Sequence, residues 1–223
     1  MSHETPIIQR IRIRFGKSHA LKYTSNLDLA KIWERVLRRA QLPILYTEGF
    51  NTRPRLQLAC PLPLGISSEY EIIDLALNEA LDYQAEQLIT ALKEVSPAGL
   101  DIYEIYDVDP RAPTLQSLAR SAEYNLTFVD GLSISYLEQK VNHILNSEAL
   151  MIEKMRKHKG RKQLTKFDIR PLILNLKPTR PDQLWAHLAV GDQGNLRPEA
   201  LLPLLDLEEA FVNIHRLFIH FES

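Results

Sequence analysis

Apolar and charged residues alternate near the beginning of the chain. In residues 7–15, the apolar positions Ile11, Ile13 and Phe15 alternate with the arginines Arg10, Arg12 and Arg14. A period of two predicts a strand with one buried face and one cationic face. Because like charges on one sheet face repel, we expect an anionic partner there, either carboxylates of the protein itself or a ligand.

A helical pattern begins at Ser25. The acidic Asp28 follows this serine by three residues, which is typical of the first turn of a helix. Beyond it, apolar residues recur on one side and cations on the other. The apolar positions are Leu29, Trp33, Val36, Leu37 and Ala40, and the cations are Lys31, Arg35, Arg38 and Arg39. The cationic side is either a solvated helix face or a binding surface for an anionic partner.

The remaining patterns predict an ordered series of elements. After an extended segment at residues 20–24 and this helix, strands are expected at 56–60 and 70–77, a helix at 83–95 and a strand at 100–108. This strand-helix-strand-strand-helix-strand order is that of a ferredoxin-like unit, an antiparallel sheet with both helices on one face.

The second half of the chain repeats the scheme. Strands are expected at 123–129, 184–190 and 214–221, extended segments at 150–155 and 166–176, and helices at 134–146 and 198–205. The sequence therefore predicts an α+β protein of two tandem ferredoxin-like units, residues 1–109 and 122–223. A linker is expected at residues 110–121, because the sequence Asp-Pro-Arg-Ala-Pro at residues 109–113 breaks the pattern.

Composition limits the chemistry that the chain can carry. The formal net charge of −1 means that any affinity for nucleic acid must come from local clusters of cations. The single cysteine, Cys60, excludes a disulfide within the chain and a thiolate metal site. With no signal-peptide pattern and no long apolar run, we expect a cytoplasmic protein that has no membrane contact. No metal or cofactor site is expected, because no histidines occur in pairs at metal-ligand spacing.

Two further segments concentrate positive charge. The loop at residues 49–55 reads G-F-N-T-R-P-R, and the run at residues 154–166 holds seven lysines and arginines in thirteen positions. The second is either a solvated hairpin or a finger that lies against phosphates. The candidate phosphate contacts are Arg12, Arg14, Lys31, Arg35, Arg38, Arg39, Arg53, Arg55, Lys157, Lys159, Arg161 and Lys162.

Several longer motifs carry a resemblance to a known family. They are L-K-Y-T-S-N-L-D-L at residues 21–29, R-R-A-Q-L-P at 38–43, G-F-N-T-R-P-R at 49–55, P-L-P-L-G-I-S-S-E-Y-E at 61–71, F-D-I-R-P-L-I at 167–173 and N-I-H-R-L at 213–217. These motifs resemble the bacterial domain of unknown function DUF2344, also called the radical-SAM-linked family. The resemblance implies a module fused to, or encoded beside, a cobalamin-binding radical S-adenosylmethionine protein, in a context of RNA processing.

The chain departs from the family pattern at two positions. Asn26 replaces a usual histidine and Thr52 a usual proline, while the motif residues Ser25, Asp28, Gly49, Phe50, Asn51 and Pro54 are kept. An amide does not titrate, so Asn26 cannot act as an acid or base. We therefore expect no catalytic residue. Asp74, a carboxylate within an apolar strand, is expected to be edge-exposed or paired with a cation such as Arg53 or Arg55.

Three functions are consistent with these features. The first is a non-catalytic accessory module of a radical S-adenosylmethionine system that binds tRNA or rRNA through its basic surface. The second is a protein-interaction partner that presents substrate to the radical enzyme encoded nearby. The third is an RNA-processing enzyme, by analogy with CRISPR ribonucleases built from tandem ferredoxin-like domains.

Overall fold

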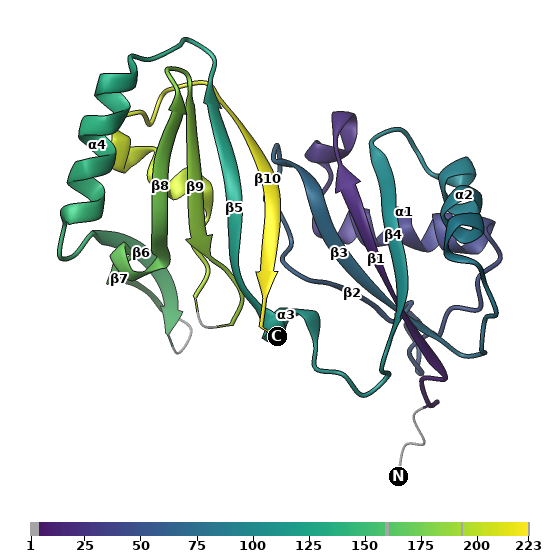
Figure 1. Cartoon of the computed structure of the whole chain (residues 1–223). Coiled ribbons are helices and arrows are strands. Elements are labelled where there is room, and N and C mark those ends of the chain that lie inside the picture. The colour runs from purple at the N-terminus through teal and green to yellow at the C-terminus, as the bar shows by residue number, and fades with distance from the viewer. Residues whose placement is uncertain (1–4, 159–160, 193, 223) are drawn as a thin grey trace. The chain divides into compact units, whose positions relative to one another are not determined.

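The chain forms two compact units in a computed structural model that describes residues 5–158, 161–192 and 194–222 (Figure 1). The first unit is Met1–Ala119 together with Arg216–Ser223, and the second is Arg120–His215. The last strand, β10 (Val212–Phe221), therefore begins in the second unit and ends in the first. This division differs from the predicted one in assigning the C-terminal residues to the first unit.

The first unit contains strands, two long helices and short helical turns. In chain order they are β1 (Gln9–Lys17), η1 (His19–Tyr23), α1 (Asn26–Arg39), β2 (Leu56–Leu58), β3 (Ser67–Leu77), α2 (Ala85–Val95), β4 (Leu100–Val108) and α3 (Leu115–Leu118). Strand β1 lies between β4 and β3, and both pairings are antiparallel. The other edge of β3 pairs with β2 and is also adjacent to β10.

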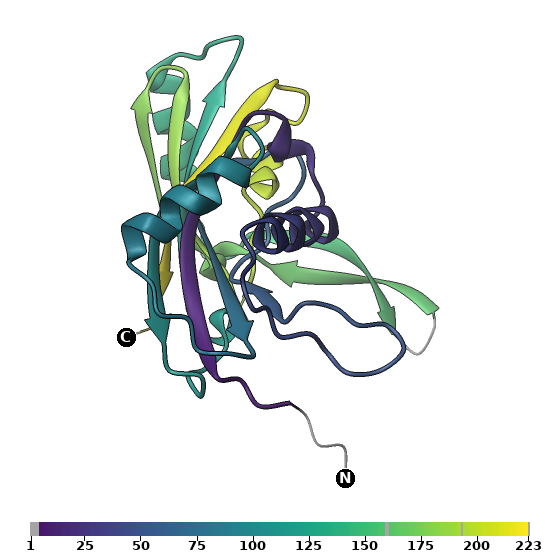
Figure 2. The same ribbon diagram turned by 90° about the vertical axis from the view of Figure 1, so that its right-hand side faces the viewer.

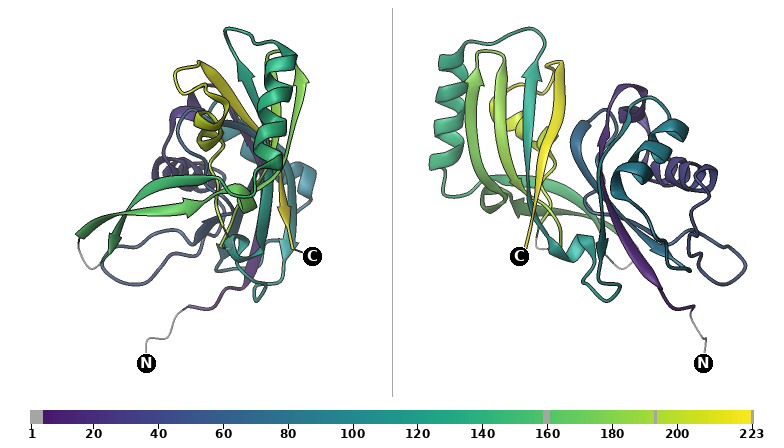
Figure 3. Two further views of the ribbon diagram at one scale, coloured as in Figure 1. Left: turned by 90° about the vertical axis from the view of Figure 1, so that its left-hand side faces the viewer. Right: turned by 45° about the vertical axis from the view of Figure 1, so that its right-hand side comes forward.

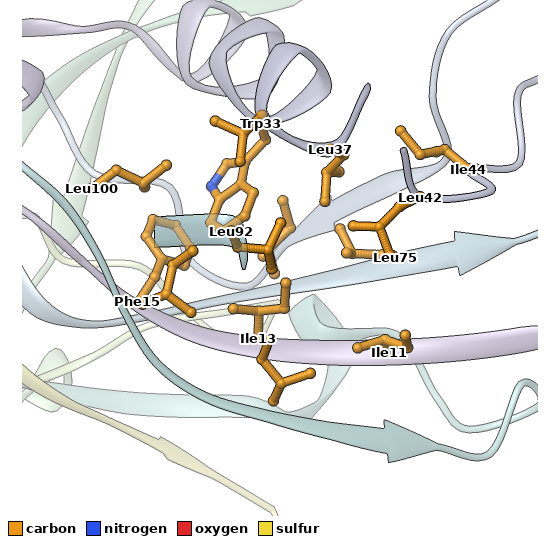
Figure 4. Close-up of a cluster of buried hydrophobic side chains, with 14 of the residues drawn as sticks. Ile11, Ile13, Phe15, Trp33, Leu37, Leu42, Ile44, Leu75, Leu92 and Leu100 are labelled. Atoms are coloured by element: carbon orange, nitrogen blue, oxygen red, sulfur yellow. The ribbon is translucent and has the colours of Figure 1, made fainter. Parts of the chain in front are cut away.

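The core of this unit lies between the sheet and its two helices. Ile11, Ile13 and Phe15 of β1 are fully buried, as the alternation predicts. Trp33 of α1 packs edge-on against Phe15, with ring centroids 5.0 Å apart, and Leu92 brings α2 into the same cluster (Figure 4). Both helices thus cover one face of the sheet, and the opposite face carries the arginines of β1.

The second unit contains further strands of the eight-stranded sheet, which also pair antiparallel. Its elements are β5 (Ala119–Phe128), α4 (Ile134–Asn146), β6 (Met151–His158), β7 (Arg161–Asp168), η2 (Arg170–Leu172), β8 (Ile173–Arg180), β9 (Gln183–Ala189), η3 (Pro198–Leu201) and η4 (Pro203–Leu205). Strand β9 lies between β5 and β8, and α4 packs against β8 (Figure 3). Strands β6 and β7 form a separate two-stranded hairpin that projects from this sheet.

Three segments differ from the expected elements. Residues 19–23 form the helical turn η1 instead of an extended segment, with His19 at a positive φ of 48°. The turn η2, which has Pro171 in its first turn, divides the segment expected to extend over 166–176 into β7 and β8. The helix expected at 198–205 is two short turns because Pro203 cannot donate a backbone hydrogen bond and starts the second turn.

Both units mix helices with mostly antiparallel strands. None of the described helices is both long and apolar enough to cross a membrane.

Candidate nucleic-acid interface

Helix α1 begins as its sequence predicts. The Ser25 hydroxyl accepts a hydrogen bond from the Asp28 backbone N–H at 3.2 Å and donates one to the Asp28 carboxylate at 2.6 Å. The hydrogen bond from Ser25 lowers the pKa of Asp28, and the nearby Lys31 lowers it further. Asp28 therefore acts as a helix-start residue, and the neighbouring Asn26 is exposed.

The cations of α1 lie on its exposed side. Lys31, Arg35, Arg38 and Arg39 are all exposed, whereas Leu29, Trp33, Val36 and Leu37 are buried. Lys31 is 3.8 Å from Asp28, a loose surface pair. Arg35, Arg38 and Arg39 line a shallow hollow of about 290 Å³. These three arginines form no ion pair within the described part of the chain, so their positive charge is available to a partner.

Hydrogen bonds between the two arms of the cationic loop that follows hold it in a hairpin-like conformation. The Thr47 N–H donates to the Arg53 carbonyl at 2.8 Å, the Arg53 N–H donates to the Thr47 hydroxyl at 2.9 Å, and Tyr46 bridges Pro54. Gly49 takes a positive φ of 112°, a conformation that favours glycine at the bend. The loop extends away from the sheet (Figure 2).

The tip of this loop presents an aromatic ring to solvent. Phe50 is fully exposed, and Asn51, Thr52 and Arg53 beside it are also exposed. At the base, the hydroxyl and backbone N–H of Thr5 donate to Glu48, and both hydrogen bonds lower the pKa of that carboxyl. The loop is therefore held at its base while its tip is free to contact a ligand.

Helix and loop form two walls of one cavity. A cavity of about 530 Å³ is lined by Leu27, Ala30, Lys31 and Glu34 of α1 and by Asn51, Thr52, Arg53, Pro54 and Leu56. Of its charged groups, Lys31 and Arg53 are positive, and Glu34 is negative. Glu34 accepts a hydrogen bond from the Tyr46 hydroxyl at 3.4 Å, and burial together with this carboxylate raises the pKa of Tyr46. The cavity thus joins two motifs that are separated in the sequence and gives them a net positive charge.

The arginines of β1 are occupied within the protein. The Nε atoms of Arg10 and Arg12 donate to Asp74 at 2.8 and 2.7 Å, and a second nitrogen of each also donates to it. Arg14 pairs with Glu104 at 3.3 Å. The expected anionic partner of this strand is therefore the protein's own carboxylates. The expectation that Asp74 would pair with Arg53 or Arg55 is wrong, because the antiparallel register places Asp74 directly opposite Arg12.

The remaining predicted phosphate contacts lie at the base of the loop and in or beside the β6–β7 hairpin. Arg55 is partly buried at the base of the loop, where its backbone N–H donates to Leu45. Lys159 lies outside the described residues. Lys157, Arg161 and Lys162 lie on the backbone of the β6–β7 hairpin, but their side chains are outside the described part of the structure.

A buried charged cluster in the first unit was not predicted. Lys17, Glu71 and Arg216 are each at most 3% exposed, and Arg216 Nε donates to Glu71 at 3.0 Å. Lys17 Nζ donates to the Thr24 carbonyl at 3.1 Å. Part of the signal is in the sequence: Lys17 lies two residues beyond Phe15 at the end of the alternation, and Glu71 is followed by the apolar Ile72 and Ile73. A charged residue next to such apolar positions indicates an internal ion pair where the fold buries it.

The described residues include no group of three or more histidine, cysteine or carboxylate side chains placed to hold a metal ion. Asn26 is exposed at the first turn of α1.

These features define a mixed α/β protein with a cationic helix and loop on one unit. The chain belongs to the family DUF2344, described as an uncharacterized protein conserved in bacteria, whose family model matches residues 10–198. No curated protein matches the sequence. Among solved structures, it is similar to a chain from "Crystal Structure of a Cbf5-Nop10-Gar1 Complex", with 10% identity and a TM-score of 0.43. The match covers 94% of this chain and 48% of that one, so this chain spans about half the length of that one. A likeness this distant does not bear on function.

Proposed function

We propose that this protein is a non-catalytic RNA-binding module whose binding surface is the exposed side of α1 together with the loop at residues 47–55. The observation that carries the proposal is the cavity of about 530 Å³ between them, which has Lys31 and Arg53 on its two walls. The three arginines farther along α1 extend the positive surface. They have no carboxylate partner in the described part of the chain, so their pairing with phosphates would not require an internal ion pair to break.

Phosphate binding would explain the positive charge of this surface, and base stacking would explain the exposed ring of Phe50 at the loop tip. Lysines and arginines that neutralise phosphates release counterions, which gives sequence-independent affinity that falls steeply with salt. Phe50 is exposed at the tip of the loop, where an unpaired base could stack on its ring. A surface helix that had only to remain solvated would have no need of an adjoining cavity or of an aromatic ring beside it.

The fold is compatible with this role. We infer that both units are variants of the ferredoxin-like fold. The order β4-β1-β3 with β2 beside β3 supports this for the first unit. In the second, β10-β5-β9-β8 repeats the order, with η3 and η4 in place of the second helix and the β6–β7 hairpin inserted after α4.

The family resemblance extends the proposal to a cellular context. We propose that the module acts in the cytoplasm beside a radical S-adenosylmethionine protein and delivers RNA to it, with no cofactor bound to this chain. Asn26 supports a non-catalytic role, because an amide cannot exchange a proton in place of the family's histidine. The β6–β7 hairpin would add cations from a second position on the chain.

Charge reversal tests the proposal. In the variant Arg38→Glu/Arg39→Glu/Arg53→Glu, we expect the affinity for tRNA to fall at least tenfold, and the slope of log affinity against log salt to decrease by about 2–3. The matched control is Lys93→Glu/Arg111→Glu/Lys177→Glu, which changes the net charge equally at exposed positions elsewhere. Fluorescence anisotropy over a salt series measures both quantities.

The same variants separate RNA binding from a protein-docking role. Equal tRNA affinity of the two triple variants would refute the proposed surface. If the α1 and loop variant instead kept its RNA affinity but no longer co-purified with the radical S-adenosylmethionine protein, the surface would be a protein interface.

A further inference from the structure

A second surface of the first unit carries a cluster of aromatic rings around one arginine. It lies on the face of the sheet opposite α1 and α2, where Arg14 projects from β1. The guanidinium carbon of Arg14 is 5.0 Å from the ring centroid of Tyr103 on β4 and 5.4 Å from that of Tyr70 on β3. The Tyr70 ring in turn lies 4.2 Å from the ring of Phe218 on β10. Four strands, β1, β3, β4 and β10, thus contribute side chains to one layer.

Part of this layer faces solvent. Tyr103 is 41% exposed and Phe218 is 38% exposed, and both border an open hollow of about 610 Å³. A hollow of this size accommodates a small ligand such as a nucleoside. Burial raises the pKa of both Tyr70 and Tyr103, so the two phenols stay neutral at physiological pH. The rings therefore offer flat apolar faces with hydroxyl groups at their edges.

The charges around the hollow do not suit a phosphate. Glu69 and Glu104 line it together with Arg14, and Arg14 is already paired with Glu104 at 3.3 Å. A phosphate would meet two carboxylates and one neutralised arginine. The hollow also differs from the centre of a protein interface, which is depleted of glutamate, because Glu69 and Glu104 both line it. A flat, neutral and aromatic ligand with polar edges fits this chemistry.

We propose that this aromatic surface, formed by Arg14, Tyr70, Tyr103 and Phe218, stacks an unpaired purine base of single-stranded RNA. Aromatic rings and arginine planes bind unpaired bases by stacking, and base edges then reach nearby polar groups. A purine presents the larger ring system to Tyr103 and Phe218. The Glu104 carboxylate at the rim accepts a hydrogen bond from the exocyclic amino group of the base.

This inference rests on the proposed RNA-binding function but uses different groups. Helix α1 and the loop at residues 47–55 would bind phosphates, whereas the aromatic surface binds a base through uncharged faces. The two surfaces lie on opposite faces of the same sheet. One RNA would therefore have to present both a charged backbone and an unpaired base, as a duplex with a single-stranded extension does.

The test compares two RNA probes that have the same phosphates. One is an octamer of adenosine, and the other is an octamer of abasic ribose, both measured by fluorescence anisotropy at 0.5 M salt to suppress phosphate binding. We expect the adenosine octamer to bind more tightly than the abasic one. In Tyr103→Leu the affinity for the adenosine octamer should fall about 5- to 150-fold, and in Tyr103→Phe it should be retained. The control is Phe211→Leu, which removes an exposed ring from the second unit; Phe211 is 74% exposed, against 41% for Tyr103.

Two results would overturn the inference. The first is equal affinity of the wild-type protein for the adenosine and abasic octamers. The second is equal adenosine affinity in Tyr103→Leu and in the Phe211→Leu control. A blunt RNA duplex, which has no unpaired base, reports separately on α1 and the loop. Charge reversal on α1 and the loop could leave the affinity for the duplex unchanged while Tyr103→Leu still weakens binding of the adenosine octamer. That result would refute the proposed phosphate-binding surface and support the aromatic surface.

Discussion

The buried cluster of Lys17, Glu71 and Arg216 provides a sharp test of the first unit's energetics. Glu71→Gln keeps the shape of the side chain and removes its charge. Arg216, which is 1% exposed, and Lys17, which is fully buried, then lose the negative charge of Glu71. Burial lowers the pKa of Lys17, and Arg216 lowers it further, while Glu71 opposes both effects. The variant thus removes the one carboxylate in this cluster that stabilises the charged forms of the two cations.

The expected loss is large for a single substitution. Removing one partner of a buried ion pair costs about 3–5 kcal/mol because the other charge stays desolvated. For a chain of this length, each kcal/mol lowers the melting temperature by about 2–4 °C, so the midpoint should fall by about 6–20 °C. In urea, the same loss corresponds to a midpoint lower by about 1–2 M.

Differential scanning calorimetry and urea unfolding of three variants test this reasoning. The matched control is Glu69→Gln, two residues away on the same strand and exposed, for which we expect a loss of about 0–1 kcal/mol. Lys17→Met removes one buried positive charge and keeps the Arg216–Glu71 pair, so its stability should stay within about 1 kcal/mol of wild type. The account is refuted if Glu71→Gln unfolds at the same midpoint as Glu69→Gln.

Two further predictions follow from ion pairs and titration in the same unit. Asp74→Asn leaves the arginines Arg10 and Arg12 without their shared carboxylate, so we expect a loss of about 3 kcal/mol in urea unfolding, whereas Glu104→Gln at the exposed Arg14 pair should lose less than about 1 kcal/mol. Burial, followed by the Asp107 carboxylate, raises the pKa of Tyr83 to about 12. The unfolded phenol loses its proton near pH 10 and the folded one near pH 12, so the free energy of unfolding should decrease as the pH rises between these values. In Tyr83→Phe this decrease, measured by guanidinium unfolding at about pH 11.5, should be smaller than in the wild type. Equal losses in Tyr83→Phe and wild type would contradict that assignment.

Much of the local structure of the first unit follows from its sequence. The alternation in β1 correctly predicts the buried Ile11, Ile13 and Phe15, because a strand points successive side chains to opposite faces. Ser25 and Asp28 likewise predict the start of α1, since the capping contacts involve residues only three positions apart. The family membership of the chain also follows from motifs that the sequence displays.

Elements that depend on backbone detail are less predictable. The turn η1 replaces an expected extended segment, and the carbonyl of Thr24, which follows it, accepts a hydrogen bond from Lys17, a contact that no periodicity displays. The division of residues 166–176 by η2 involves Pro171, which restricts the backbone at that point. In both segments a few local contacts outweigh the hydrophobic pattern.

The sequence by itself determined the cationic side of α1, the basic loop at residues 49–55 and the alternation of arginines on β1. Only the tertiary structure decided which of these cations are available. The register of β1 against β3 places Asp74 beside Arg10 and Arg12 and so neutralises them, whereas Arg38, Arg39 and Arg53 remain exposed. Pairing between strands depends on residues more than sixty positions apart, and a charge pattern along one segment cannot reveal the partner that the fold brings to it.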